Sequence, residues 1–326
     1  MSPQGSVAGP PSMGYPSSAA GPPGGVSTTD KESATMAAYT AKDVSTLRQR
    51  TQAGMMDCKK ALEENQGDME LAVEWLRKKG IARGENRAGR AASEGKVVAV
   101  VTPDGKAGAI VELNSETDFV ARNEVFARTA EQIAAALLAD AKQDGTVATA
   151  DGSPLMASKF GDAGSLADHL KQFTGTIGEN IVLRRYARFG GSGCVGAYVH
   201  HNGKVGALVE LSGITGEAGT QLARTIAEHI TAGVPTVPLA VTRDDVPAEV
   251  VERERRIHSE KAAESGKPAN IIEKMVEGQV NRFFKEVTLL DQPWVRDDSK
   301  TISQLVKEAG AGASIRRFAR FQIGQE

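Results

Sequence analysis

The chain has 326 residues, of which 25% are charged and 40% apolar, and its formal net charge at pH 7 is −2. At about 150 residues per domain, this length predicts roughly two folded units with a sizeable core. The near-neutral charge gives no electrostatic basis for bulk nucleic-acid binding, and no apolar stretch approaches the ~18 residues needed to cross a bilayer. Two cysteines, Cys58 and Cys194, are too few for a disulfide framework, so a reducing, cytoplasmic compartment fits best.

The first 35 residues differ in composition from the rest of the chain. Of these, 19 are Pro, Gly or Ser, and only three are charged. Such a segment cannot bury enough apolar area to offset its chain entropy. We therefore expect residues 1–35 to form a disordered tail.

Residues 36–80 carry the pattern of three short helices. Thr40 and Asp43 form a capping-box-like pair at the start of the first helix. Asp68 is placed to cap the third helix, whose apolar residues repeat at helical spacing until Gly80 ends the run. This pattern predicts a compact three-helix module.

The remainder of the chain is an internal duplication. The run Gly105–Leu113 reappears as Gly203–Leu211 at an offset of 98, with seven of nine positions identical. Later, Leu183–Phe189 matches Ile315–Phe321 at an offset of 132. Alternating apolar residues in these runs predict β-hairpins and returning strands, with helices between them.

These patterns together predict an α+β fold. After the three-helix module we expect a linker over 81–96, a first core half over 97–190 and a second over 191–326. The growth of the offset indicates an insertion of about 35 residues in the second half, which we interpret as an antiparallel helical hairpin at about 247–284. A solvated structural arm and a partner contact are both open interpretations of this hairpin.

Few motifs in the sequence indicate chemistry. Gly191-Ser-Gly-Cys-Val-Gly196 matches a dinucleotide-binding fingerprint, but the residues after it continue as a strand, whereas the fingerprint needs a helix N-terminus to receive the phosphates. None of the five histidines has a metal-ligand companion at close spacing. The sequence therefore predicts no active site, no metal and no cofactor.

The two copies differ after the hairpin. The first copy reads Thr117-Asp118-Phe119-Val120, and the position 98 residues beyond Phe119 is Glu217. Asp118 is placed to cap the following helix. Phe119 either packs under that helix or is an exposed anchor for the pocket of a partner, and the spacing leaves both possibilities open.

Three runs carry a resemblance to a known family: Leu47–Leu62, Asn65–Asp68 and Glu116–Asn123. They closely resemble bacterial elongation factor Ts, and the resemblance extends over about residues 36–326. It implies a ubiquitin-associated-like N-terminal domain, a core of two halves and a coiled-coil arm. It also implies a guanine-nucleotide exchange factor that makes no bond itself and releases GDP from elongation factor Tu so that GTP can rebind.

The resemblance also implies the binding residues. Thr117, Asp118, Phe119 and Val120 would act near the magnesium and phosphate site of the partner's GTPase domain, and Arg48, Met55 and Met56 would contact the same domain. The expected partner is elongation factor Tu, GDP-bound or nucleotide-free, with no direct nucleic acid and no membrane. Two alternatives stay open: an adaptor for ubiquitin-like modifiers, built on the three-helix module, and an enzyme of unknown type.

Overall fold

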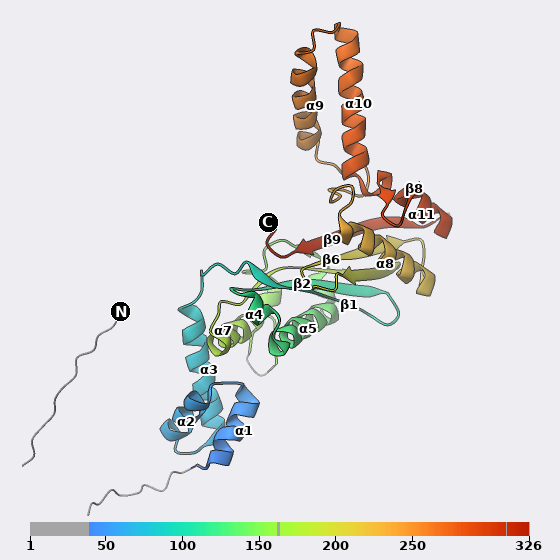
Figure 1. Ribbon diagram of the computed structural model, residues 1–326. Helices are drawn as coiled ribbons and strands as arrows, with labels where there is room; N and C mark the ends of the chain where they lie inside the picture. Colours follow the sequence, from blue (N-terminus) through green and yellow to red (C-terminus); the bar gives the residue numbers. More distant parts are fainter. Residues whose placement is uncertain (1–38, 162–163, 311, 326) are drawn as a thin grey trace, which may run out of the picture. The chain divides into compact units, whose positions relative to one another are not determined.

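The computed structural model describes residues 39–161, 164–310 and 312–325. The tail expected over residues 1–35 lies outside these ranges. As predicted, the fold mixes helix and sheet: three helices come first, and strands and helices of an α+β core follow (Figure 1). Within the described ranges, no helix is both long and apolar enough to cross a membrane.

The first three helices share an apolar core. Their bounds are α1 (Ala41–Thr51), α2 (Met55–Glu64) and α3 (Met69–Glu85). Thr40 and Asp43 make the predicted capping box of α1, and the Asp68 carboxylate caps α3 by accepting from the Leu71 N–H at 2.9 Å. The buried side chains come from all three helices: Leu47, Cys58, Ala61, Leu62, Ala72 and Leu76.

The third helix does not end at Gly80, as the sequence pattern predicts, but continues for another five residues. Here α3 lies beside α7 (Leu166–Ile177) (Figure 1). A Cβ on Gly84 would lie 2.2 Å from a backbone oxygen of α7, and one on Gly175 would lie 2.2 Å from Gly80 O. The glycines thus permit close helix packing, and the interval 81–96 contains the end of α3 as well as the start of the first strand.

The first half of the core contains an antiparallel sheet, whose strands lie in the order β1-β2-β4-β3, and several helices. Its strands are β1 (Glu94–Val101), β2 (Ala107–Ser115), β3 (Gly145–Val147) and β4 (Val182–Gly190). Its other elements are α4 (Asp118–Ala121), α5 (Glu124–Ala139), a 3₁₀ turn (Ala141–Gln143), α6 (Pro154–Ala157) and α7. Sheet and helices share one apolar core, which includes Val111, Leu113, Phe126, Ile133, Leu170 and Tyr186.

The second half repeats this plan with a sheet in the order β5-β6-β9. Its strands are β5 (Cys194–Val199), β6 (Val205–Ser212) and β9 (Ser314–Gln322). It also contains α8 (Gly216–Ala232), a 3₁₀ turn (Leu289–Asp291), the short pair β7 (Pro293–Trp294) and β8 (Asp297–Thr301), and α11 (Ile302–Ala309). Its core includes Val209, Leu211, Ile226, Ile230, Leu289 and Ile302.

The two halves repeat their internal contacts as well as their sequence. The register shifts directly after Glu112 in one sheet and directly after Glu210 in the other. Arg185 Nε donates to Glu112 at 2.6 Å, and Arg317 Nε donates to Glu210, also at 2.6 Å. Both carboxylates are buried. The duplication predicted from the sequence therefore includes the same buried ion pair in each half.

The contacts between the halves are reciprocal, as approximate two-fold symmetry requires. The Val97 N–H donates to Gly203 O at 2.8 Å, and the Val195 N–H donates to Gly105 O at 2.7 Å. Each bond is the copy of the other at the offset of 98. Between the sheets lies a shared apolar core made of four pairs of equivalent residues, two at the offset of 98 (Val97 and Val195, Ile110 and Leu208) and two at the offset of 132 (Ala187 and Ala319, Phe189 and Phe321).

Two helices form the arm inserted in the second half, seen at the top of Figure 1: α9 (Ala248–Ala263) and α10 (Ala269–Val287). Helical spacing in the sequence marks Ile257, Ile272, Met275 and Val276 among the apolar residues of these helices. Ile257 and Met275 are exposed, whereas Ile272 and Val276 lie in the seam between the helices. The other residues of the seam are Val251, Ala262, Val280 and Phe284.

Candidate partner-binding site

The turn that follows β2 displays the residues singled out in the sequence. We call Thr117–Val120 the wedge turn. The Thr117 hydroxyl caps α4 by accepting from the Val120 N–H at 3.4 Å, and Asn123 caps α5. The prediction that Asp118 caps the following helix is wrong, because its carboxylate pairs with Arg122 at 2.8 Å instead.

Neighbouring residues of the wedge turn differ sharply in burial. Phe119 is 80% exposed, more than any other large apolar side chain in the described ranges. Val120 beside it is half-buried and packs against the core of the first half. This exposure excludes one of the two possibilities that the sequence leaves open for Phe119, packing under the following helix. In the second half α8 begins at Gly216, the position equivalent to Asp118, and continues without a break to Ala232, whereas α4 ends at Ala121 and α5 begins only at Glu124.

The wedge turn is anchored by a loop that sequence analysis did not single out. Both Glu179 carboxylate oxygens accept hydrogen bonds from Thr117, one from its hydroxyl at 2.6 Å and one from its N–H at 3.0 Å. In return, the Asn180 N–H donates to the Glu116 carboxylate at 2.7 Å. These partners lie more than 60 residues apart in the chain, so no local pattern reveals them.

The remaining predicted binding residues lie on α1 and α2. Met55 and Met56 form the first turn of α2 and are 57% and 74% exposed, and Arg48 is exposed on α1. The structure thus places the predicted residues in two groups, one on α4 and one on the three-helix module. Two exposed methionines side by side are an adaptable apolar surface of the kind that binding sites use.

Basic residues near the end of α3 stabilise the module. Asp57 accepts from Arg83 at 2.6 Å and from Lys79 at 2.9 Å. The hydrogen bond from Arg83, with Lys79 adding to it, holds the pKa of the Asp57 carboxyl below its usual value. These contacts join α2 to α3 and give Arg83 a structural role.

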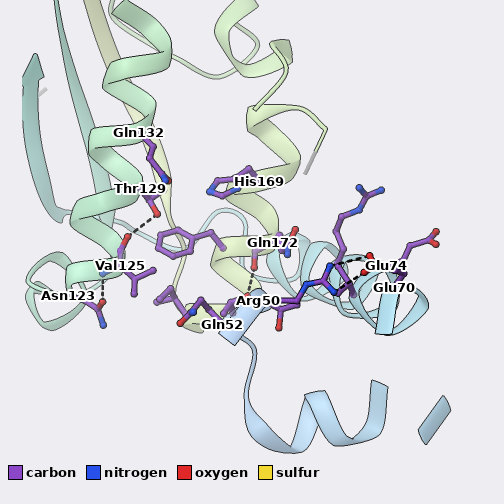
Figure 2. A pocket seen from close by; sticks show the side chains of 16 residues that line it. Arg50, Gln52, Glu70, Glu74, Asn123, Val125, Thr129, Gln132, His169 and Gln172 are labelled. Atoms are coloured by element: carbon purple, nitrogen blue, oxygen red, sulfur yellow. Dashed lines mark hydrogen bonds and ion pairs between the residues drawn. The ribbon is translucent and has the colours of Figure 1, made fainter. Parts of the chain in front are cut away.

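A groove of about 970 Å³ lies between the three-helix module and the first core half (Figure 2). Side chains from four helices line it: Arg50 and Gln52 of α1, Glu70 and Glu74 of α3, Asn123, Val125, Thr129 and Gln132 at α5, and His169 and Gln172 of α7. Most of these are polar, and Arg50 is held by a bidentate contact with Glu70.

His169 is the histidine among the residues that line the groove. It lies against the rings of Phe160 and Phe173, and burial lowers its pKa. Across the described ranges, no group of three or more His, Cys, Asp or Glu side chains is arranged to hold a metal ion. The Gly191–Gly196 motif leads into β5, where a Cβ on Gly196 would lie 2.4 Å from the backbone nitrogen of Arg224 in α8. Close packing explains this glycine.

Comparison with known proteins agrees with this architecture. The sequence model of the family described as Elongation factor TS matches residues 116–325. An elongation factor Ts from Hyphomonas neptunium is 46% identical over 297 residues, covering 89% of this chain and 93% of the relative. Those from Alkalilimnicola ehrlichii and Aquifex aeolicus are 43% and 40% identical, each over 88% of this chain and over 93% and 98% of their own lengths.

These comparisons identify the chain as a translation elongation factor. Its features are the wedge turn, the three-helix module and the duplicated α+β core. The chain belongs to the elongation factor Ts family.

Proposed function

We propose that the protein is a guanine-nucleotide exchange factor without bond-making chemistry. It binds elongation factor Tu carrying GDP, displaces the magnesium and promotes GDP release, so that GTP can rebind. Family membership supports this proposal and gives no support to the alternative, an adaptor for ubiquitin-like modifiers. The observation that carries it is the exposure of Phe119 on a turn held by the core.

The mechanism needs only differential binding. A factor that binds the nucleotide-free partner more tightly than the GDP-bound partner must lower the affinity for GDP by the same ratio. Phe119 enters the GTPase domain as a wedge, and Asp118 perturbs the hydrogen-bonded network around magnesium and phosphate. Arg48, Met55 and Met56 hold the same domain from the three-helix module.

The proposed setting is a reducing, cytoplasmic one, which the free buried thiols of Cys58 and Cys194 support.

The contribution of Phe119 follows from its exposed area. Burying a phenylalanine side chain contributes about 1.5–3 kcal/mol, and each 1.4 kcal/mol corresponds to a factor of ten. Phe119→Ala is therefore expected to reduce exchange roughly ten- to hundredfold. Because the ring is 80% exposed in the free protein, the stability of the fold should hardly change.

The test is the release of fluorescent GDP from elongation factor Tu with this protein at substoichiometric concentration. The matched control is Glu217→Ala, which alters the equivalent exposed position of the second half. We expect acceleration by the intact chain and by the control, and a large loss with Phe119→Ala. Release at the spontaneous rate with the intact chain would refute the proposed function.

A further inference from the structure

The loop after α7 and the wedge turn are joined by a crossed set of hydrogen bonds. Glu179 accepts from the backbone and from the side chain of Thr117, at 3.0 and 2.6 Å. Asn180, the next residue, donates its N–H to Glu116 at 2.7 Å and its side-chain amide to Arg90 O, also at 2.7 Å. Two consecutive residues of the loop thus hold two consecutive residues beside α4.

The Thr117 hydroxyl has two roles at once in this arrangement. It accepts from the Val120 N–H, which starts α4, and donates to Glu179. A carboxylate only accepts, so it fixes the direction of the hydroxyl proton and leaves the oxygen lone pairs for the cap. Hydrogen bonds to an ionised acceptor are also stronger than those between neutral groups. The Glu179 carboxylate is therefore bonded to the hydroxyl that caps the first turn of α4, the turn that carries Phe119.

The same loop connects the wedge turn to the three-helix module. Gly178, with a φ of 88°, ends α7 directly before Glu179. A Cβ on Gly175 of α7 would lie 2.2 Å from Gly80 O of α3. A Cβ on Gly84 of α3 would lie 2.2 Å from Lys171 O of α7. A continuous chain of contacts thus runs from the module through α7 to the wedge turn.

We propose that Glu179 is a positioning residue for exchange: together with Asn180 it holds the wedge turn in its binding geometry before the partner arrives. This inference rests on the proposed function and deepens it. A preorganised turn does not have to be ordered during binding, so that cost is absent from the association. Glu179 acts through Phe119 and does not touch the nucleotide itself.

The experiment is a double-mutant cycle in the full-length protein, read out as GDP release from elongation factor Tu. Glu179→Ala should lower exchange about tenfold, equivalent to ~1.4 kcal/mol. The same change in a Phe119→Ala background should have no further effect, because the wedge that it positions is already gone. Glu131→Ala is the matched control, because this exposed glutamate of α5 lies outside the hydrogen-bond set.

The outcomes separate this inference from the proposed function. If the intact chain accelerates release and Phe119→Ala does not, while Glu179→Ala is as active as the intact chain, the positioning role is wrong and the exchange function stands. Equal losses from Glu179→Ala in both backgrounds would also overturn it, because Glu179 would then act independently of the wedge. If Glu179→Ala does not fold, as judged by its circular dichroism, the isosteric Glu179→Gln takes its place in the same cycle with the same criteria. An inactive intact chain refutes the exchange function itself.

Discussion

Replacing Gly175 by alanine tests the packing of α3 on α7, because two effects of the change have opposite signs. Gly175 lies inside α7, and alanine is favoured over glycine in a helix interior by ~1 kcal/mol. The new Cβ, however, would lie 2.2 Å from Gly80 O and 2.8 Å from Gly80 C. These backbone atoms cannot give way unless α3 shifts. Such a clash belongs at the upper end of the ~1–3 kcal/mol that overpacking costs, so we expect a net destabilisation of ~2 kcal/mol.

The assay is urea unfolding of the full-length protein, followed by circular dichroism. Gly278→Ala is the matched control: it is the same substitution inside α10, where no atom lies within 4 Å of the added Cβ. The control should unfold at a slightly higher urea concentration and Gly175→Ala at a lower one. If Gly175→Ala unfolds at the same concentration as the parent or at a higher one, the two helices do not pack as closely as the structure indicates.

Three further predictions concern binding, pH and the duplicated ion pairs. Replacing Met55 and Met56 together by alanine should weaken binding of elongation factor Tu about tenfold or more, as titration calorimetry would measure, with little change in stability; unchanged affinity would contradict this. Burial lowers the pKa of His229, so its neutral form contributes stability that is present above pH ~6.5 and is lost as the pH falls. Urea unfolding at pH 7 and pH 5 should show this loss, and equal stability at the two pH values would exclude the contribution of His229. Arg317→Leu should cost ~1.5–3 kcal/mol in the same assay, because the buried Glu210 carboxylate loses Arg317 and keeps Arg316 as its arginine partner. Adding Glu210→Leu should restore much of this loss; a double variant as unstable as the single one would argue against this cause.

The sequence predicts those features that depend on local pattern. Thr40 and Asp68 are helix caps in the structure because a cap is a contact between residues two or three positions apart. The core strands follow from alternation, and their duplication from closely similar runs that recur first at an offset of 98 and later at one of 132. The same reasoning singles out Phe119, since a difference between two copies is visible without a structure.

Features that depend on distant contacts could not be predicted in this way. Local propensity makes Gly80 a typical helix end, but packing on α7 keeps the helix going, and the close approach of the two helices falls at Gly84 and Gly175. Asp118 has the right type for a cap, yet Thr117 precedes it and takes that position. Glu179 lies 62 residues from Thr117 in the chain, and nothing in its neighbourhood marks it as the anchor.

The reciprocal contact between the halves also determines how the two copies can change. The Arg185 guanidinium lies 5.0 Å from the centre of the Phe321 ring, and Arg317 lies 4.4 Å from that of Phe189, so each half rests on the other through the same pair of side chains. In a symmetric dimer, every substitution occurs on both sides of the axis at once. Here both sides belong to one chain, so a substitution alters one side and leaves its counterpart intact. One half can therefore keep a protruding aromatic ring while the other has a glutamate at that position, and the axis that joins them is preserved.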